Sequence, residues 1–167
     1  NLRGGDHRPS HEAAIPAARL SEVEENFNRQ HQDVRTEAGV AYGDLPDHVD
    51  AGYMANVARV NIAALASLGR APARPRAVRL DVRGLDQDTT LLFVPDPDAA
   101  VRYEVLARPS AASSWTEALP IGRSGNARIP RSKDHWTFAL RAIGPRGHRS
   151  LAVFPLPLET GDPWPPP

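Results

Sequence analysis

The sequence predicts an α+β protein in which a partial α/β segment precedes an antiparallel β-sandwich. Two hydrophobic periods support this fold class, and they meet near residue 70. Before that point, apolar residues between Asp50 and Gly69 recur at intervals of three and four, which is typical of a helix. After residue 76, apolar and polar residues alternate in short segments bounded by turn residues, which is typical of antiparallel strands.

Length and composition exclude several classes of protein. The chain has 167 residues, no Cys, and 20 basic against 20 acidic residues. A net charge of zero removes the electrostatic reason to expect nucleic acid or an anionic membrane as a partner. Without Cys there is no disulfide framework, no thiolate nucleophile and no Cys-based zinc site. No apolar run approaches the roughly 20 residues of a membrane helix.

Residue usage and the start of the sequence carry two further expectations. Lys133 is the only Lys among the basic residues, and Arg, Ala and Pro are frequent. This usage predicts a high-GC bacterial source. The sequence begins Asn-Leu-Arg-Gly-Gly, without Met or a secretory signal, so we expect a piece of a longer protein.

The first part, residues 1–69, contains a predicted strand, a long loop region and one helix. The apolar run from Pro16 to Leu20 predicts a buried strand, and the polar region from Glu22 to Pro46 predicts long loops. In the helix, Asp50 is the expected N-cap and Gly69 the expected left-handed C′ residue. The predicted buried stripe of this helix comprises Met54, Val57, Asn61, Ala64, Leu65 and Leu68.

A Pro- and Arg-rich linker, residues 70–76, leads into the predicted sandwich at residues 77–155. The alternation predicts about seven strands between Ala77 and Phe154. Trp115 and Trp136 are interpreted as core aromatics of the sandwich rather than as platforms for sugar stacking. The tail, residues 156–167, is too rich in Pro for a strand and is expected to be extended and polyproline-like.

Three segments of the second part carry a resemblance: "LLFVPDPDAAVRYEVLAR", "SSWTEALPIG" and "WTFALRAIGPRGHRS". Their aromatic and apolar positions, followed by a Gly-containing hairpin and Ser, resemble a fibronectin type III module. The residues that fill those positions are Phe93, Tyr103, Trp136, Phe138, Leu140, Ala142, Gly147 and Ser150. The resemblance implies a fold and no particular function.

Four pieces of the first part occur in a fixed order: Asp6-His7, residues 15–18, the stretch His31-Gln32-Asp33, and the helix from Asp50. In this order they resemble the C-terminal end of the catalytic domain of di-zinc aminopeptidases, the twenty-eighth metallopeptidase family, relatives of the glutaminyl cyclases. The implied fold of residues 1–69 is the strand, long loop and C-terminal helix of an α/β zinc exopeptidase. The implied parent reaction is removal of N-terminal amino acids from a peptide by metal-activated water.

The same resemblance implies roles for individual residues. His31 corresponds to the last zinc ligand, and Asp6 and His7 to neighbours that position ligands or substrate. The family binds two zinc ions, and its other ligands and general base precede this segment. One imidazole cannot hold zinc, which needs three or four protein ligands. We therefore expect no catalytic residue within this chain and no activity without a missing N-terminal catalytic segment or a partner chain.

The resemblance also implies export, to the periplasm or the medium. Three positions depart from the family pattern, with Ser10, Ala14 and Gln32 standing where Phe, Gly and Thr are usual.

Other interpretations of the same residues stay open. From the residues alone, His31 is an ordinary His of a surface loop, and only the resemblance favours a zinc ligand. Glu22, Glu24 and Glu25 are either a solvated acidic loop or a substrate rim that attracts a free α-amino group. In "HRPSHE", Pro9 lies between two His and predicts against a helical pair, so no metal site is expected there.

At the level of function, the alternative is a non-catalytic interaction module. In it the sandwich binds a protein or polysaccharide, and the first 70 residues are a decayed remnant or an adaptor. A third interpretation is a processed subunit that completes its site with a partner chain. A strand and helix taken from a larger sheet leave apolar surface uncovered, which predicts disorder, oligomers through the exposed sheet edge, or folding against further sequence.

Overall fold

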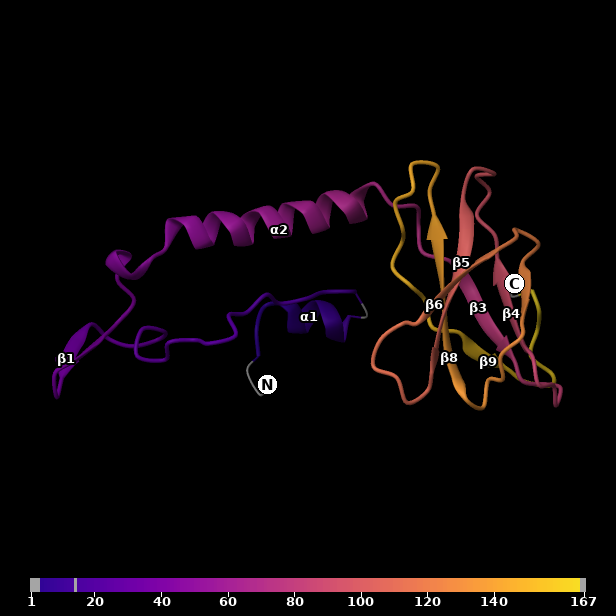
Figure 1. The fold of residues 1–167 in the computed structure, drawn as a ribbon, viewed down its shortest axis with the longest axis horizontal. Helices are drawn as coiled ribbons and strands as arrows, with labels where there is room; N and C mark the ends of the chain where they lie inside the picture. The colour runs from indigo at the N-terminus through magenta and orange to yellow at the C-terminus, as the bar shows by residue number, and fades with distance from the viewer. Residues whose placement is uncertain (1–3, 14, 166–167) are drawn as a thin grey trace. The chain divides into compact units, whose positions relative to one another are not determined.

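The computed structural model describes residues 4–13 and 15–165. The chain divides into two compact units, residues 1–55 and 56–167, which are described separately (Figure 1). The helices are α1 (His7–Glu12), the 3₁₀ helix η1 (Pro46–His48) and α2 (Ala51–Gly69). The strands are β1 (Arg35–Glu37), β2 (Val40–Tyr42), β3 (Arg76–Asp81), β4 (Thr89–Val94), β5 (Arg102–Pro109), β6 (Glu117–Ile121), β7 (Asn126–Ile129), β8 (Trp136–Ile143) and β9 (Leu156–Leu158).

The first unit is mostly loop, and it differs from the prediction in two places. No strand forms between Pro16 and Leu20. A strand exists only where a neighbour completes its hydrogen bonds, and no described residue pairs with this run. The predicted loop region contains an antiparallel hairpin, β1 and β2. Its turn places Ala38 and Gly39 at φ values of 48° and 80°, as a tight two-residue hairpin turn requires.

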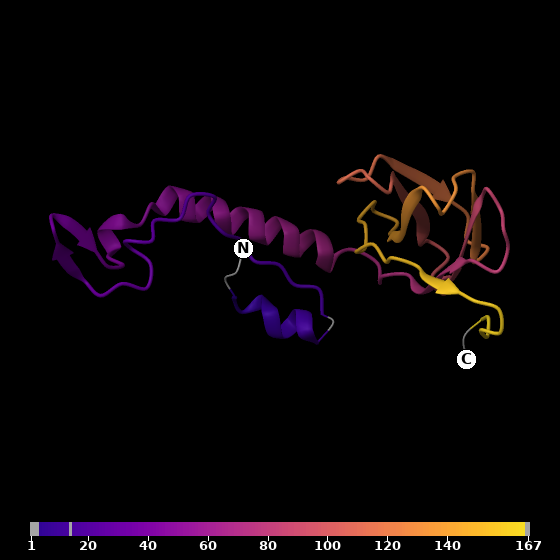
Figure 2. The same cartoon turned by 90° about the horizontal axis from the view of Figure 1, so that it is seen from below.

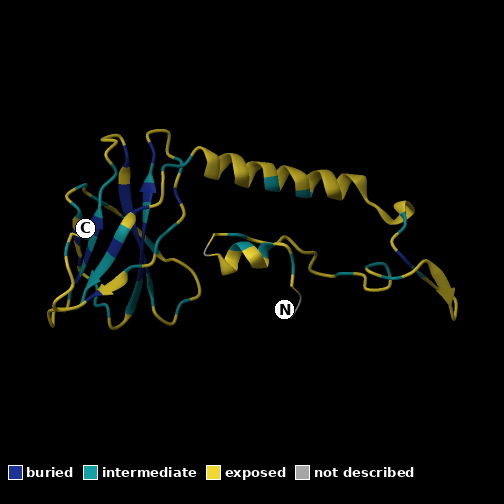
Figure 3. Cartoon of the chain, turned by 180° about the vertical axis from the view of Figure 1, so that it is seen from behind, coloured by how far each residue is buried: buried dark blue, intermediate teal, exposed yellow. Residues whose placement is uncertain are grey.

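Helix α2 begins as predicted. The Asp50 carboxylate accepts a hydrogen bond from the backbone N–H of Tyr53, with Oδ1 and N 2.9 Å apart, which confirms the N-cap. The end differs, because Gly69 is the last helical residue and does not have a positive φ. None of the described helix residues is buried, so the predicted buried stripe is wrong for this chain. Only Val57 and Asn61 are half-buried (Figure 3).

The second unit contains the β-sandwich. One antiparallel sheet has the order β6-β5-β8, and the other has the order β7-β4-β3-β9. Among the described residues these are seven strands, and β9 lies beyond the predicted last strand. It pairs in parallel with β3, so the start of the tail is a strand (yellow in Figure 2). Leu158 explains this difference, since it is fully buried and anchors the Pro-containing segment at the sheet edge.

The sandwich core follows from the alternation in the sequence. Its buried cluster is Val78, Leu91, Phe93, Val101, Tyr103, Val105, Ala107, Ile129, Phe138, Leu140 and Ala142. The rings of Phe93 and Tyr103 pack with centroids 4.7 Å apart. The Tyr103 hydroxyl accepts a hydrogen bond from the Asp96 N–H at 2.7 Å, so its polar end is satisfied.

Two aromatic residues depart from the predicted core. Trp115 is 36% exposed and lies against Phe154, with ring centroids 5.8 Å apart. Trp136 is half-buried, and the Arg131 guanidinium lies over its ring at 5.1 Å. Trp136 therefore borders the core, whereas Trp115 lies outside it.

A buried carboxylate stabilises the outer side of the three-stranded sheet. Glu104 on β5 accepts hydrogen bonds from Arg141 Nε at 2.5 Å and Arg149 Nε at 2.9 Å. Burial acts to raise the pKa of the Glu104 carboxyl, but the two guanidinium groups outweigh burial and hold that pKa below its usual range.

Among the described residues, no helix has the length and apolarity needed to cross a membrane.

Candidate functional site

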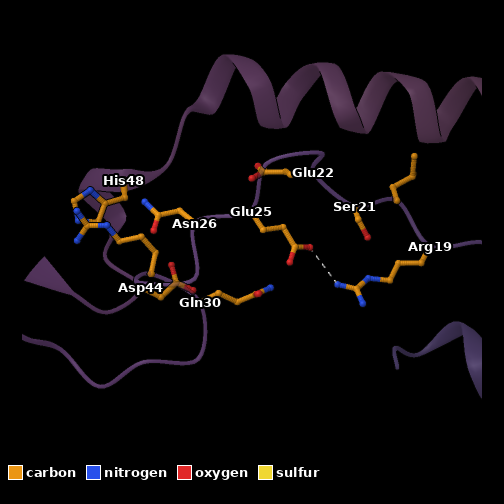
Figure 4. Close-up of a pocket in the computed structure, with 10 residues that line it drawn as sticks. Arg19, Ser21, Glu22, Glu25, Asn26, Gln30, Asp44 and His48 are labelled. Carbon is orange, nitrogen blue, oxygen red and sulfur yellow. Dashed lines mark ion pairs between the residues drawn. The ribbon is translucent and has the colours of Figure 1, made fainter. Parts of the chain in front are cut away.

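The candidate site is a pocket of about 600 Å³ within residues 19–48. Its lining includes Arg19, Glu22, Glu25, Arg29, Asp44 and His48. Figure 4 shows Arg19 facing Glu25 on one side and His48 at the other end. The lining offers three carboxylates and two guanidinium groups, so a ligand with both a cationic and an anionic group finds a partner for each.

Two guanidinium groups of the pocket are held differently. Arg19 Nη2 lies 3.7 Å from Glu25 Oε1, and Arg19 Nη1 donates a hydrogen bond to the Gly4 carbonyl at 3.0 Å. Arg29 Nη1 is buried and has no hydrogen-bond partner among the described residues. A buried donor without a partner costs free energy, which an anionic group entering the pocket would recover.

A second pocket, of about 520 Å³, shares part of this lining. Glu22 and His48 line both pockets, and Glu24 lines the second together with Tyr53. The three predicted rim residues are therefore brought to two adjoining pockets. Their role as a substrate rim stays a prediction.

His31 lies on the surface loop between these residues and β1. It is exposed and has φ of 55°, in the left-handed region that non-glycine residues rarely adopt. The loop is tied at its base, where the Gly43 N–H donates to the Asn28 carbonyl at 3.0 Å. Gly43 has φ of 109°, and a Cβ there would lie 2.8 Å from the Val34 Cα, so the close approach requires glycine.

Gln32, one of the departures from the family pattern, has a structural partner on each side. Its Nε2 donates to the Phe27 carbonyl at 3.4 Å, and its Oε1 accepts from Arg35 Nη1 at 3.1 Å. Ser10 lies half-buried in α1, and Ala14 falls outside the described residues.

Asp6 and His7 lie at the start of α1. Asp6 is exposed and makes no side-chain cap bond, whereas His7 is half-buried. Helix α1 runs through Pro9, so the expectation that Pro9 prevents a helical His pair is wrong. Pro9 is the third helical residue, and a proline is tolerated in the first turn because an N–H there has no intrahelical acceptor.

The described residues do not form a zinc centre. They contain no group of three or more His, Asp or Glu side chains placed to hold one ion. Zinc needs three or four donors, and His31 would supply one. Any zinc held through His31 therefore requires donors from outside the described residues of this chain.

The structure adds pocket residues that the sequence did not single out. His48 lies in η1 and lines both pockets, and Asp44 follows the buried Gly43. Each is one polar residue in a polar loop, and no sequence pattern distinguishes it. Only the folding back of residues 44–48 onto residues 19–30 brings them to the site.

Comparison with known proteins points to one class. The chain is 47% identical over 157 residues to a protein of Leptosphaeria maculans named "Probable zinc metalloprotease". Proteins of the same name in Pyrenophora tritici-repentis and Pyricularia oryzae are 45% and 42% identical. These matches cover 93% of this chain and 36%, 32% and 32% of the relatives. The chain thus spans about a third of the length of the curated relatives it matches.

These relatives correct the expected source, because they are fungal and not bacterial. The Arg-rich composition alone could not distinguish the two. No protein-family model matches the chain. Among solved structures, an Fn3-like protein from Clostridium thermocellum matches with a TM-score of 0.43 at 15% identity, covering 56% of this chain and 98% of its own.

Proposed function

We propose that this chain is the C-terminal part of a zinc-dependent, aminopeptidase-like hydrolase. The observation that carries the proposal is identity of 42–47% to fungal zinc metalloproteases along 93% of the chain. In this proposal the parent reaction removes N-terminal amino acids, and the remaining metal ligands and the general base come from further sequence or a partner chain. The parent is an exported protein that acts on peptides.

The residues of this chain recognise and position the substrate. Glu22 and Glu24 are exposed and line the two pockets, where their carboxylates can bind the α-ammonium group of a peptide. The buried Nη1 of Arg29 offers a donor to a carbonyl or carboxylate of the same ligand. His31 would supply one ligand to the catalytic zinc, and its left-handed backbone fixes the direction in which the imidazole leaves the loop.

A chimera tests the proposal. The matching segment of the Leptosphaeria maculans relative is replaced by this chain. Two quantities are then measured, the rate at which the chimera hydrolyses leucine anilide and the amount of zinc that it binds. His31→Ala is expected to lower both the zinc content and the rate. Glu22→Gln with Glu24→Gln is expected to raise KM by about tenfold or more, because each removes a charged hydrogen bond. Glu159→Gln, outside the pockets, is the matched control and should leave KM unchanged.

Two outcomes would contradict the proposal. One is turnover above background by the isolated chain supplied with zinc, which would show that it carries a complete site. The other is a folded, zinc-loaded chimera whose zinc content and rate are both unchanged by the His31→Ala substitution.

One observation favours a second candidate, the non-catalytic interaction module. Trp115 and Phe154 form an exposed aromatic pair, 36% and 59% exposed, and the Arg108 guanidinium lies 5.6 Å from the Trp115 ring centroid. An exposed aromatic pair of this kind can bind a sugar ring or a protein side chain. Retention of the chain on an insoluble polysaccharide, abolished by Trp115→Ala, would support the module.

A further inference from the structure

Helix α1 carries two imidazoles one helical turn apart. His7 and His11 are four residues apart, and their ring centroids are 6.3 Å apart with an interplanar angle of 73°. Residues at this spacing project from the same face of a helix, where two imidazoles can reach one ion. We propose that His7 and His11 form a binding site for a divalent transition-metal ion.

Both imidazoles are available as metal ligands. Among the described residues, neither imidazole makes a hydrogen bond or an ion pair. His7 Nδ1 is buried, where a Cβ on Gly5 would lie 3.1 Å from it, which leaves Nε2 as the nitrogen that can meet an ion. His11 is exposed. A metal bound through Nε2 holds His7 in the tautomer that carries its proton on Nδ1.

The charges around the pair include Arg19, because its Cδ and His7 Nδ1 both lie next to Gly5, and its guanidinium pairs with Glu25, with Nη2 and Oε1 3.7 Å apart. Arg8 and Glu12 occupy the neighbouring row of the helix and pair with each other, with Nη2 and Oε1 3.6 Å apart. The positive charge next to the imidazoles is thereby balanced. Asp6, directly before the helix, adds one exposed carboxylate and gives the segment a net negative charge.

The donor set selects the kind of ion. Imidazole nitrogen suits Cu²⁺, Ni²⁺ and Zn²⁺, whereas Mg²⁺ and Ca²⁺ prefer oxygen. No third His, Asp or Glu is placed to join the pair among the described residues, so water completes the coordination. For the same ligands, affinity is expected to be highest for Cu²⁺, and lower for Ni²⁺ and Zn²⁺. The site shares His7 with the peptidase resemblance, whereas His11 takes no part in it, so His11→Ala tests the site apart from the proposed function.

Copper titration of the chain tests this inference. Calorimetry with Cu²⁺ is expected to show a site whose affinity falls by about tenfold or more in His7→Ala and in His11→Ala. In NMR spectra, Cu²⁺ is expected to broaden the imidazole signals of these two residues first. Added protons compete with the metal for the nitrogens, so binding should weaken at acidic pH.

A matched variant separates the effect of where the histidines lie on the helix from the effect of how many there are. H11A/E12H keeps the number of histidines but moves one imidazole about 100° round the helix, since α-helical residues are spaced by that angle. It should bind Cu²⁺ as weakly as His11→Ala, while His31→Ala and His48→Ala should bind as the unchanged chain does. The proposal is overturned if H11A/E12H or His11→Ala keeps full affinity, or if broadening starts at His31, His48, His135 or His148. Unchanged amide signals of both α1 and the sandwich in each variant show that the chain is still folded.

Discussion

Phe93 in strand β4 and Leu65 in helix α2 are both large apolar residues that the sequence places on a buried face. Phe93 is 1% exposed, whereas Leu65 is 69% exposed. The sandwich closes two sheets over one core, so its strands bury one another. Helix α2 has an apolar face with no sheet packed on it among the described residues. The comparison teaches that the sandwich is complete in its packing, whereas the first unit and α2 present a surface that further chain could cover.

The largest expected effect contrasts those two residues directly. Phe93→Ala should destabilise the sandwich by about 3–5 kcal/mol, because it removes a fully buried ring and leaves a cavity. Leu65→Ala should change the free energy of unfolding by no more than about 0.5 kcal/mol, since its side chain is already in water. Urea denaturation followed by tryptophan fluorescence measures both. Equal effects of the two substitutions would show that α2 is packed against something in solution.

The second-largest expected effect concerns Glu104, the buried carboxylate of the sandwich. Glu104→Gln should cost about 1–3 kcal/mol at neutral pH, because it leaves Arg141 and Arg149 without their shared anion. The pKa of Glu104 is lowered in the folded state, so its contribution to stability is fully present above the ordinary pKa of a glutamate in the unfolded chain. The contribution is lost as the pH falls through the folded pKa. Denaturation curves from pH 7 to pH 2 should therefore converge for the two proteins at the acidic end.

Within the first unit, Gly43→Ala tests whether the loop that carries His31 has a defined conformation. The added Cβ, at a φ of 109° and 2.8 Å from Val34 Cα, should destabilise the loop by about 1–3 kcal/mol. Amide exchange between residues 26 and 44 should accelerate, while the melting temperature of the sandwich stays unchanged. Gly39→Ala is the matched control, since it has a positive φ but no atom within 4 Å of the added Cβ. If neither variant changes exchange, the loop is not held in solution.

The smallest expected effect is on α2 itself. Asp50→Ala removes the side-chain cap of the Tyr53 N–H and should destabilise the helix by about 1 kcal/mol. With so little packing to hold it, the first turn should fray, which lowers the circular dichroism at 222 nm. Asp50→Asn retains a capping oxygen and should preserve the signal. An unchanged spectrum in the Ala variant would indicate that tertiary contacts, not the cap, hold the helix start.

The strands of the sandwich could be predicted because alternation with period two depends on local residues alone. The pairing of Tyr103, Phe138 and Leu140 in one core follows from that pattern. Strand β9 could not be predicted, since its Pro157 argues against a strand, and only the free edge of β3 gives Leu156–Leu158 a partner. The candidate site was predicted in part: Glu22, Glu24 and Glu25 are an acidic cluster in sequence, whereas Asp44 and His48 join them only through the path of the loop.

By itself, the sequence determined the sandwich, the helix cap at Asp50 and the resemblance of the first part to zinc peptidases, because each is written in local spacing or in ordered motifs. The tertiary structure alone decided which apolar faces are covered and which polar residues share a pocket. It also decided that His7 and His11 form a helical pair, because Pro9 falls in the first turn. Burial and proximity depend on partners far along the chain, and a periodic pattern states that a face is apolar without stating what packs against it.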